Sequence, residues 1–377
     1  MKTTRLSAAI AGAAAIALAL TACGSDDNTG AAGGTSDSAS AGGGSSVACP
    51  DGSASISGAG SSAQANAMEQ WITDFQTVCS SEQVQYDGSA GSGGGITNFT
   101  GKQIDWAGSD AALSQSKGEV DKAAAACGSP AWNLPMVVGP IAMAYNLKGV
   151  DSLTLTPTLI AEIYNGTITT WNDSKIAAEN SGVSLPGTTI TPVFRSDDSG
   201  TTQNVETYLS KNVPDVFTDT PDKTWSNNTG AIGQGASKSA GVQQAVQGTD
   251  GAIGYVEYSF AQAGNLSVAK IDNGGGAVEL STDSASKAVA AAKVTGTDGD
   301  VSLELDYATQ ESGAYPLILV TYEIVCSKYA DAAKGSAVKA FLEYTSGDGQ
   351  GALADLGYAP LPDSVLSQVK DSVSKVS

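Results

Sequence analysis

Short apolar segments alternate with helix-like segments along this chain from residue 53 onward, and this alternation limits the possible folds most strongly. The strand-like segments are residues 53–57, 84–86, 104–107, 136–146, 190–194, 252–256 and 317–325. The helix-like segments are residues 62–79, 95–99, 114–126, 337–344 and 364–373. Strands separated by helices indicate βαβ units, and therefore an α/β fold with mostly parallel sheets flanked by helices. Because the chain is longer than one compact α/β domain usually needs, we expect two domains with a ligand cleft between them.

The first 22 residues are predicted to be an export signal. Lys2 and Arg5 precede an uninterrupted run of small apolar residues, 8–20, which is too short to remain as a membrane-spanning helix. The run ends in Leu-Thr-Ala-Cys-Gly around Cys23, which resembles the lipobox of bacterial lipoproteins, in which the cysteine is acylated and becomes the new N-terminus. The alternative is an ordinary secretory signal followed by an accidental cysteine.

Residues 23–47 are predicted to be a lipid anchor and a flexible linker. The segment is rich in Gly, Ser and Ala and has no large apolar residue before its end, so it cannot bury enough surface to fold. A coil of this length reaches about 27 Å root-mean-square, which would let an anchored domain move just above the membrane. The folded part is therefore expected to begin near Cys49.

Four further cysteines agree with an exported protein: Cys49, Cys79, Cys127 and Cys326. Four cysteines allow three pairings, and we prefer Cys49–Cys79 with Cys127–Cys326. Cys49 precedes the first strand and Cys79 ends the first helix, which places both at the same end of a βαβ unit. The other pairings remain open. The sequence has no C-x-x-C motif and no Cys/His cluster, so we expect no metal site.

The charge balance and the lack of histidine exclude several function classes. The chain has 19 Lys and Arg against 39 Asp and Glu, and removal of Lys2 and Arg5 would take the net charge from −20 to −22. Such a surface repels nucleic acid and anionic lipid headgroups. With no histidine in the sequence, Ser-His-Asp and Cys-His nucleophile systems and histidine phosphatases are excluded.

Two glycine-rich segments each lie where a helix follows a strand. Residues 58–63 fit G-x-G-x-x-A, but an exported protein has no obvious nicotinamide supply, so a dinucleotide site is a weak interpretation. Residues 91–96 are predicted to be a second glycine loop that opens a helix, in which Ser92 offers a hydroxyl and an N–H. N–H groups at a helix N-terminus favour an anion of any kind. A flexible surface turn is the alternative for the second segment.

Two polar segments follow strands at the end where α/β sheets place ligands. Asp110 comes directly after a strand, where an aspartate is usually a helix cap. Arg195 supplies a forked cation, and Ser199, Gly200 and Thr201 supply hydroxyls and N–H groups at the start of an amphipathic helix. A capping turn with a surface arginine is the alternative for the second segment.

Taken together, these four segments resemble the substrate-binding lipoproteins of the bacterial Pst phosphate ABC transporter, members of the type II periplasmic binding protein class. Residues 162–166, 170–173, 251–258 and 358–362 also resemble signatures of that family, in the same order. The resemblance extends from residue 53 to the C-terminus and is weakest over residues 269–313. It implies a two-domain type II fold, with domain I formed by residues 48–137 and 315–377 and domain II by residues 138–314.

The resemblance also implies a phosphate site. The expected contacts are Ser62, Ala63, Ser92, Asp110, Arg195, Ser199, Gly200 and Thr201, with Asp197 as the carboxylate partner of Arg195. This sequence departs from the family pattern at several positions: Ser62 stands where threonine is common, Ala63 where a larger residue is common, and Gly93 where a second serine is found. Asp198 stands where glycine is usual, and an extra carboxylate there could raise the cost of binding an anion.

Asp110 would select phosphate in this interpretation. An ionised carboxylate only accepts hydrogen bonds, so it needs a ligand that carries a proton, which phosphate does near neutral pH and sulfate does not. The expected function is therefore high-affinity phosphate capture outside the cytoplasm by a lipid-anchored monomer, and delivery to membrane permease subunits. No cofactor, catalysis or nucleic-acid partner is expected. The alternatives are a binding protein for another oxyanion such as arsenate, a metal-dependent phosphoesterase, and a structural lipoprotein on the same scaffold.

Overall fold

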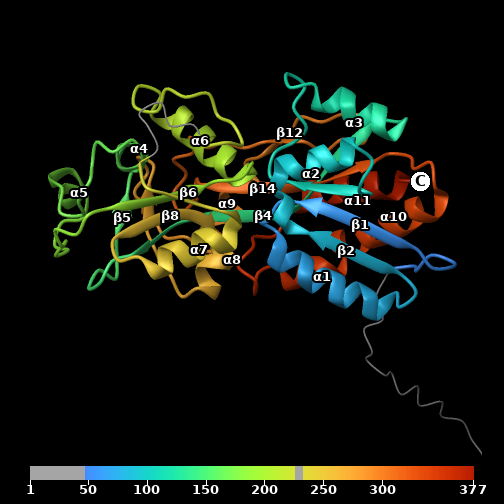
Figure 1. Ribbon diagram of the computed structural model, residues 1–377, viewed down its shortest axis with the longest axis horizontal. Coiled ribbons are helices and arrows are strands. Elements are labelled where there is room, and N and C mark those ends of the chain that lie inside the picture. Colours follow the sequence, from blue (N-terminus) through green and yellow to red (C-terminus); the bar gives the residue numbers. More distant parts are fainter. Residues whose placement is uncertain (1–46, 226–231) are drawn as a thin grey trace, which may run out of the picture. The chain divides into compact units, whose positions relative to one another are not determined.

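The computed structural model describes residues 47–225 and 232–377 (Figure 1). The predicted signal peptide, the predicted acylation site Cys23 and nearly all of the predicted linker lie outside the described residues. Among the residues that are described, no helix is both long and apolar enough to cross a membrane.

A nine-stranded sheet runs through the described part of the chain, in the order β2-β1-β3-β14-β4-β8-β6-β7, with β9 paired to β4. Its strands are β1 (Ser55–Gly60), β2 (Gln83–Asp87), β3 (Trp106–Ser109), β4 (Ala131–Asn146), β6 (Thr191–Arg195), β7 (Gln234–Ala236), β8 (Ala252–Glu257), β9 (Ser267–Val268) and β14 (Ile318–Cys326). A three-stranded sheet contains β5 (Thr154–Leu155), β10 (Lys270–Asp272) and β11 (Ala277–Val278). A two-stranded sheet contains β12 (Lys293–Val294) and β13 (Leu303–Glu304).

Strand β4 joins two halves of the sheet. Its first part, residues 131–140, pairs with β14, and its second part, residues 141–146, pairs with β8 and partly with β9. The β1 half of the sheet consists of β2, β1, β3, β14 and the first part of β4. The β8 half consists of the second part of β4 with β8, β6, β7 and β9. The outer strands pair in parallel as expected for βαβ units, whereas β14 and β4 run antiparallel at the centre, so the sheet as a whole is mixed.

Helices cover the sheet on both sides. In the view of Figure 1, α1, α7 and α8 lie below the sheet, and α2, α3 and α6 lie above it. The helices are α1 (Ala65–Val78), α2 (Gly91–Thr100), α3 (Glu119–Cys127), α4 (Pro157–Tyr164), α5 (Ser174–Glu179), α6 (Gly200–Asn212), α7 (Lys238–Gly248), α8 (Tyr258–Ala263), α9 (Thr282–Ala290), α10 (Ala332–Ser346) and α11 (Asp363–Lys375). Short 3₁₀ turns are η1 (Gly88–Ala90) and η2 (Asp348–Ala352).

All predicted strands and helices are present, but some begin at other residues than expected. Helix α2 begins at Gly91, so the segment predicted as a glycine loop is the first turn and a half of the helix. Glycine inside a helix costs about 0.5–1 kcal/mol relative to alanine, which is why the sequence favoured a loop. Close packing explains Gly95, because a Cβ there would lie 2.6 Å from the carbonyl oxygen of Ala59 in β1. Helix α3 begins at Glu119, five residues later than predicted.

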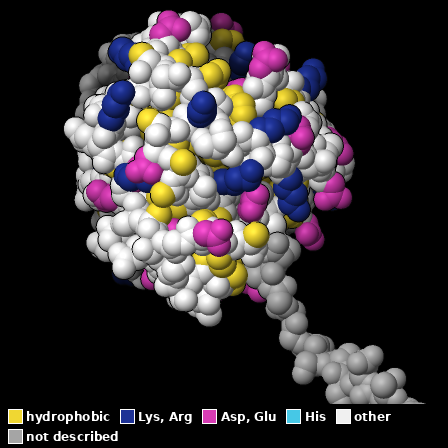
Figure 2. All heavy atoms as spheres, turned by 90° about the vertical axis from the view of Figure 1, so that its right-hand side faces the viewer, with side chains coloured by type: hydrophobic (Ala, Val, Ile, Leu, Met, Phe, Trp, Pro, Cys, Tyr) yellow, Lys and Arg dark blue, Asp and Glu magenta, His cyan; other side chains and the backbone are white. Residues whose placement is uncertain are grey.

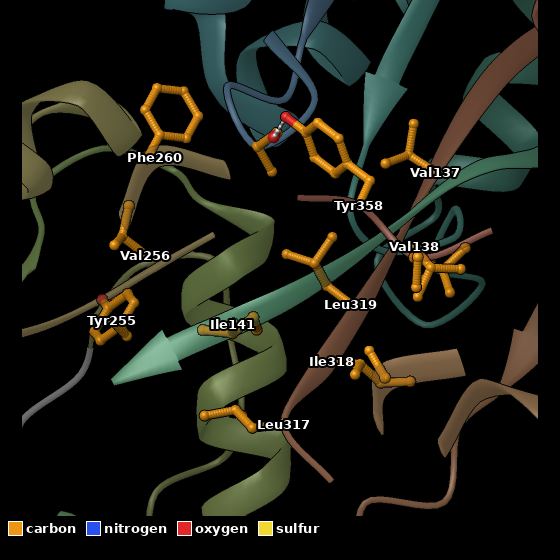
Figure 3. Close-up of a cluster of buried hydrophobic side chains, with 14 of the residues drawn as sticks. Val137, Val138, Ile141, Tyr255, Val256, Phe260, Leu317, Ile318, Leu319 and Tyr358 are labelled. Atoms are coloured by element: carbon orange, nitrogen blue, oxygen red, sulfur yellow. Dashed lines mark hydrogen bonds between the residues drawn. The ribbon is translucent and has the colours of Figure 1, made fainter. Parts of the chain in front are cut away.

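An apolar cluster fills the region where the two halves of the sheet meet (Figure 3). All residues of β14 are buried, and so are all residues of β4 except those at its two ends, as expected for strands covered on both faces. The cluster includes Val137, Val138, Ile141, Tyr255, Val256, Phe260, Leu317, Ile318, Leu319 and Tyr358. The hydroxyl of Tyr358 donates to the carbonyl oxygen of Ala63, at 2.7 Å, and thus connects the C-terminal segment to the turn after β1.

Both preferred disulfides are confirmed. Cys49 pairs with Cys79, which connects the start of the described chain to the C-terminal end of α1. Cys127 pairs with Cys326, which connects the end of α3 to the end of β14 across a sequence separation of 199 residues.

The surface carries both signs of charge. Figure 2 shows lysines and arginines interspersed with acidic side chains on one face, with apolar side chains only in small groups. Of the large apolar residues that the structure describes, Val78 and Ile232 are exposed. This face therefore has no continuous apolar area.

Candidate functional site

Asp110 is a buried carboxylate that directly follows β3. Its side chain accepts hydrogen bonds at Oδ1 from the hydroxyls of Ser61 (2.5 Å) and Thr321 (2.8 Å), and at Oδ2 from the hydroxyl of Ser92 (3.1 Å). The three donors come from the end of β1, from β14 and from the first turn of α2, so the carboxylate is held from three directions.

Burial raises the pKa of Asp110 from 3.8 to about 6, and the negative charge of Glu257 adds to this effect. Hydrogen bonds from Ser61 and Thr321 and the charge of Arg195 act in the opposite direction. The carboxylate is therefore mainly ionised at pH 7, and becomes mainly neutral below about pH 6.

Arg195 ends β6, and its guanidinium is almost fully buried. Nε and Nη2 donate to the two carboxylate oxygens of Asp197 at 2.9 and 2.6 Å, which is the bidentate geometry that fixes a guanidinium plane. Nη1 donates to the hydroxyl of Thr201 at 3.4 Å. Lys238 also pairs with Asp197, at 3.1 Å. Although burial opposes its ionisation, the hydrogen bonds and charge of Arg195 hold the pKa of Asp197 well below its usual range.

The N-terminus of α6 meets the carboxylate of Asp110. Ser199 caps the helix by accepting from the N–H of Thr202, and the N–H of Gly200 donates to the hydroxyl of Ser92 at 3.3 Å. Only glycine fits at position 200, because a Cβ there would lie 2.6 Å from the Cβ of Asp110 and 2.7 Å from the hydroxyl oxygen of Ser92. The start of α6, which follows β6, thus contacts Asp110 after β3 and Ser92 in α2.

Of the predicted site residues, Gly200 contacts Ser92 and Asp110 from the other side of the junction, and Arg195 contacts Thr201 at the same helix start. The other predicted residues lie beside them with different partners. The hydroxyl of Ser62 bonds that of Ser239 at 2.9 Å, and the N–H of Ala63 donates to the hydroxyl of Ser61 at 3.0 Å. The N–H of Ser199 donates to the carbonyl oxygen of Lys223 at 2.7 Å.

Among the residues of this cluster that sequence reasoning missed are Ser61, Thr321 and Glu257. Ser61 directly precedes a predicted contact, and the sequence provides no reason to prefer one of the two serines. Thr321 and Glu257 are polar residues within or at the end of apolar strand segments, and a buried polar residue in such a place is the signal that could have identified them.

Asp198 does not bring its carboxylate into the cluster. Its side chain is exposed and accepts from the hydroxyl of Thr224 at 2.9 Å. It also lies over α2, where a Cβ on Gly93 would be 2.7 Å from the Cβ of Asp198. The two departures from the family pattern therefore belong together, since glycine at position 93 makes room for the side chain at position 198.

A cavity of about 290 Å³ borders Asp110 between α6 and residues 303–307. Its walls include Asn204, which donates to the carbonyl oxygen of Asp110 at 2.7 Å. Within residues 47–225 and 232–377, no group of three or more His, Cys, Asp or Glu side chains is arranged to hold a metal ion. The donors of the cluster are hydroxyls, N–H groups and one guanidinium, and this set suits an oxyanion.

A buried polar cluster at the junction of two halves of a sheet is a candidate ligand site, and comparison with known protein families assigns the chain to the periplasmic binding protein class. A family model described as the PBP superfamily domain matches residues 31–348. The curated relatives are more specific. Phosphate-binding protein PstS3 of Mycobacterium bovis is 44% identical over 384 residues, with 100% of both chains covered. Phosphate-binding protein PstS 2 of Mycobacterium tuberculosis is 43% identical over 381 residues, again with 100% of both chains covered. The chain therefore belongs to the PstS family of phosphate-binding proteins.

Solved structures show the same fold at lower identity. A high-affinity periplasmic phosphate-binding protein, solved with phosphate bound, has a TM-score of 0.68 and 22% identity, and the match covers 84% of this chain and 93% of that chain. A putative phosphate ABC transporter substrate-binding protein from Clostridium perfringens has a TM-score of 0.59 and 18% identity, over 82% of this chain and 100% of that chain. These likenesses support the α/β fold that the sequence predicts.

Proposed function

We propose that this protein captures inorganic phosphate outside the cytoplasm and delivers it to the permease of an ABC transporter, without catalysing a reaction. The observation that carries the proposal is the buried carboxylate of Asp110 beside Arg195 and the N-terminus of α6. An acceptor-only group next to so many donors suits an anion that still carries a proton. The names of the PstS relatives agree with this ligand.

In this proposal, hydroxyls, N–H groups and one guanidinium hold the phosphate oxygens. The residues are Ser62, Ala63, Ser92, Arg195, Ser199, Gly200 and Thr201, with Asp110 as the acceptor of the ligand proton. Asp197 orients Arg195 through its two hydrogen bonds. Neutral dipoles and one cation can hold a desolvated oxyanion although the whole chain has a net charge of −20.

The domain division and the anchor are also part of the proposal. Domain I would comprise residues 48–137 and 315–377, and domain II residues 138–314. The change of partners along β4, from β14 to β8 between Pro140 and Ile141, supports a division close to this point. Residues 1–22 would be removed as a signal peptide. Acylation of Cys23 would hold the monomer at the outer face of the membrane, with the segment up to residue 47 as the linker.

Calorimetric titration of a soluble chain that begins at Val47 tests this proposal. We expect saturable binding of phosphate and of arsenate, which is protonated in the same way, and no binding of sulfate. Sites that require a missing hydrogen-bond donor discriminate by about 10⁴–10⁵. We also expect no turnover of p-nitrophenyl phosphate, with or without divalent metals. Absence of phosphate binding by the folded protein would contradict the proposal.

Asp110→Asn tests the selective role of the carboxylate. The amide can donate to an unprotonated oxyanion, so we expect sulfate binding to appear while phosphate binding weakens. If the variant still bound phosphate as tightly as the wild type and still ignored sulfate, the assignment of Asp110 would be wrong.

A further inference from the structure

Glu257 is a second buried carboxylate at the site. It ends β8, precedes α8 and has 0% of its surface exposed. Its Oε1 accepts from the hydroxyl of Thr201 at 2.6 Å. Its Oε2 is buried and has no hydrogen-bond partner among the described residues. A buried carboxylate oxygen without a donor is costly, so a ligand that donates a hydrogen bond to this atom would stabilise the site.

Three titratable groups face Glu257 from other elements, and its charge acts on each of them. The pKa of Arg195, at the end of β6, is lowered by burial but raised overall by Asp197 and by Glu257. The pKa of Asp110, after β3, is raised mainly by burial and also by Glu257. The pKa of Tyr358 in the C-terminal segment is raised by burial and, to a lesser degree, by Glu257. Glu257 therefore belongs to the same electrostatic cluster as Asp110 and Arg195.

The hydrogen bond to Glu257 changes what Thr201 can offer a ligand. A hydroxyl has one hydrogen, and here that hydrogen points at Oε1 of Glu257. The oxygen already accepts from Nη1 of Arg195 at 3.4 Å. Towards a ligand, the Thr201 side chain can therefore act only as an acceptor, as Asp110 does, while its N–H remains a donor at the helix start.

The charges at the site also favour a ligand that carries an additional proton. Three carboxylates, those of Asp110, Asp197 and Glu257, lie around two cations, Arg195 and Lys238. A phosphate dianion would add two negative charges to a cluster that already has more carboxylates than cations. Taking up a proton together with the ligand reduces this repulsion and supplies a donor for Oε2 of Glu257.

We propose that Glu257 is a second proton-accepting position of the site, so that phosphate binds together with one proton more than Asp110 alone requires. This inference rests on the proposed function. The extra proton comes from solvent when the dianion binds, or arrives on the monoanion, and it returns to solvent on release. It lies between the ligand, Thr201 and Glu257, and no covalent bond forms or breaks apart from this proton transfer.

Calorimetry in two buffers of different ionisation enthalpy counts the protons. At about pH 8, where free phosphate is mainly the dianion, we expect the wild-type protein to take up about one proton per phosphate bound. Above this pH the association constant should fall by about tenfold per pH unit, because one proton is linked to binding. In Glu257→Gln, whose amide oxygen can still accept from Thr201, we expect proton uptake near zero and an association constant that is almost independent of pH.

Glu82→Gln is the matched control. Glu82 is also buried, accepts from the N–H of Ala54 through one oxygen, and has no described hydrogen-bond partner for the other. It lies at the opposite end of β1 from the site, so this variant should take up the same number of protons as the wild type. Wild-type phosphate binding without proton uptake would overturn the inference, even if Glu257→Gln failed to fold. Equal uptake by the wild type and Glu257→Gln would also overturn it, and both results would leave phosphate capture intact. Absence of phosphate binding would instead reject the proposed function.

Discussion

Single side chains at the site determine whether the protein supplies the donor or the acceptor of each hydrogen bond to a ligand. Asp110 can only accept while it is ionised, and three hydroxyls already point at it. Arg195 can only donate, and Asp197 holds its fork in one plane. Specificity for a protonated anion then depends on the charge state of one carboxylate, which changes with pH.

Sulfate exclusion should weaken as the pH falls. Because the pKa of Asp110 is about 6, the side chain becomes neutral below that pH and can donate a hydrogen bond to sulfate. We expect sulfate to compete with phosphate increasingly as the pH falls from about 7 to 5, as measured by displacement titrations. In Asp110→Asn, the competition of sulfate with phosphate should not depend on pH in this range. If it depended on pH as strongly as in the wild type, the explanation would be wrong.

The pairing of Gly93 with Asp198 can be tested by a double-mutant cycle. Gly93→Ser should destabilise the protein by about 1–3 kcal/mol, because the new Cβ would overlap with the Asp198 side chain. Asp198→Gly removes the obstacle, so the double variant should recover most of that stability in urea unfolding. Strictly additive effects would show that the two positions are independent.

Among the elements, α6 and α2 contribute most to the site, because each directs its first turn at Asp110. The sequence predicted the start of α6 correctly, because the polar segment of Ser199, Gly200 and Thr201 comes before an amphipathic helix, which Ser199 caps in the structure. It misplaced the start of α2, because the fit of glycines against β1 is a tertiary contact that intrinsic helix propensity does not register. The start of α6 depends on Gly200 in a similar way.

Gly200→Ala should move the start of α6 away from the β1 half of the sheet. The added methyl group would meet Asp110 and Ser92, so α6 would have to move away from the carboxylate. We expect phosphate affinity to fall by at least about tenfold, and stability to fall by about 1–3 kcal/mol. Gly241→Ala is the control, because in α7 the nearest atom to a new Cβ is 3.7 Å away and alanine favours a helix. If both variants bound phosphate normally, the close approach at Gly200 would not matter for binding.

At the scale of the whole molecule, two ion pairs join the β1 half to the segment that follows α6. Lys223 pairs with Glu119 at the start of α3, at 3.1 Å, and both side chains are largely buried. Lys117 pairs with Asp222 at 2.5 Å, and both side chains are exposed. The carbonyl oxygen of Lys223 also accepts from the N–H of Ser199, so this connection extends to the cap of α6.

The two ion pairs should differ greatly in their contribution to stability. Lys223→Gln leaves Glu119 without its buried partner, and we expect a loss of about 3–5 kcal/mol in urea unfolding. Lys117→Gln breaks an exposed pair and should change stability by about 1 kcal/mol at most. Similar losses in the two variants would show that burial does not control the strength of this connection.

The sequence by itself predicted the alternation of strands and helices, the start of α6 and the preferred pairing of the cysteines, and the family resemblance supplied the candidate site residues. The first two depend on local information: the period of apolar residues and a polar loop next to a strand end. Only the tertiary structure decided that Thr321 donates to Asp110 from 211 residues away and that Glu257 binds Thr201. Those contacts exist because β14 inserts between β3 and β4, and β4 continues into the β8 half of the sheet. The physical reason is that strand order and antiparallel insertion bring distant residues together, and no local pattern in the chain encodes which buried polar groups then meet.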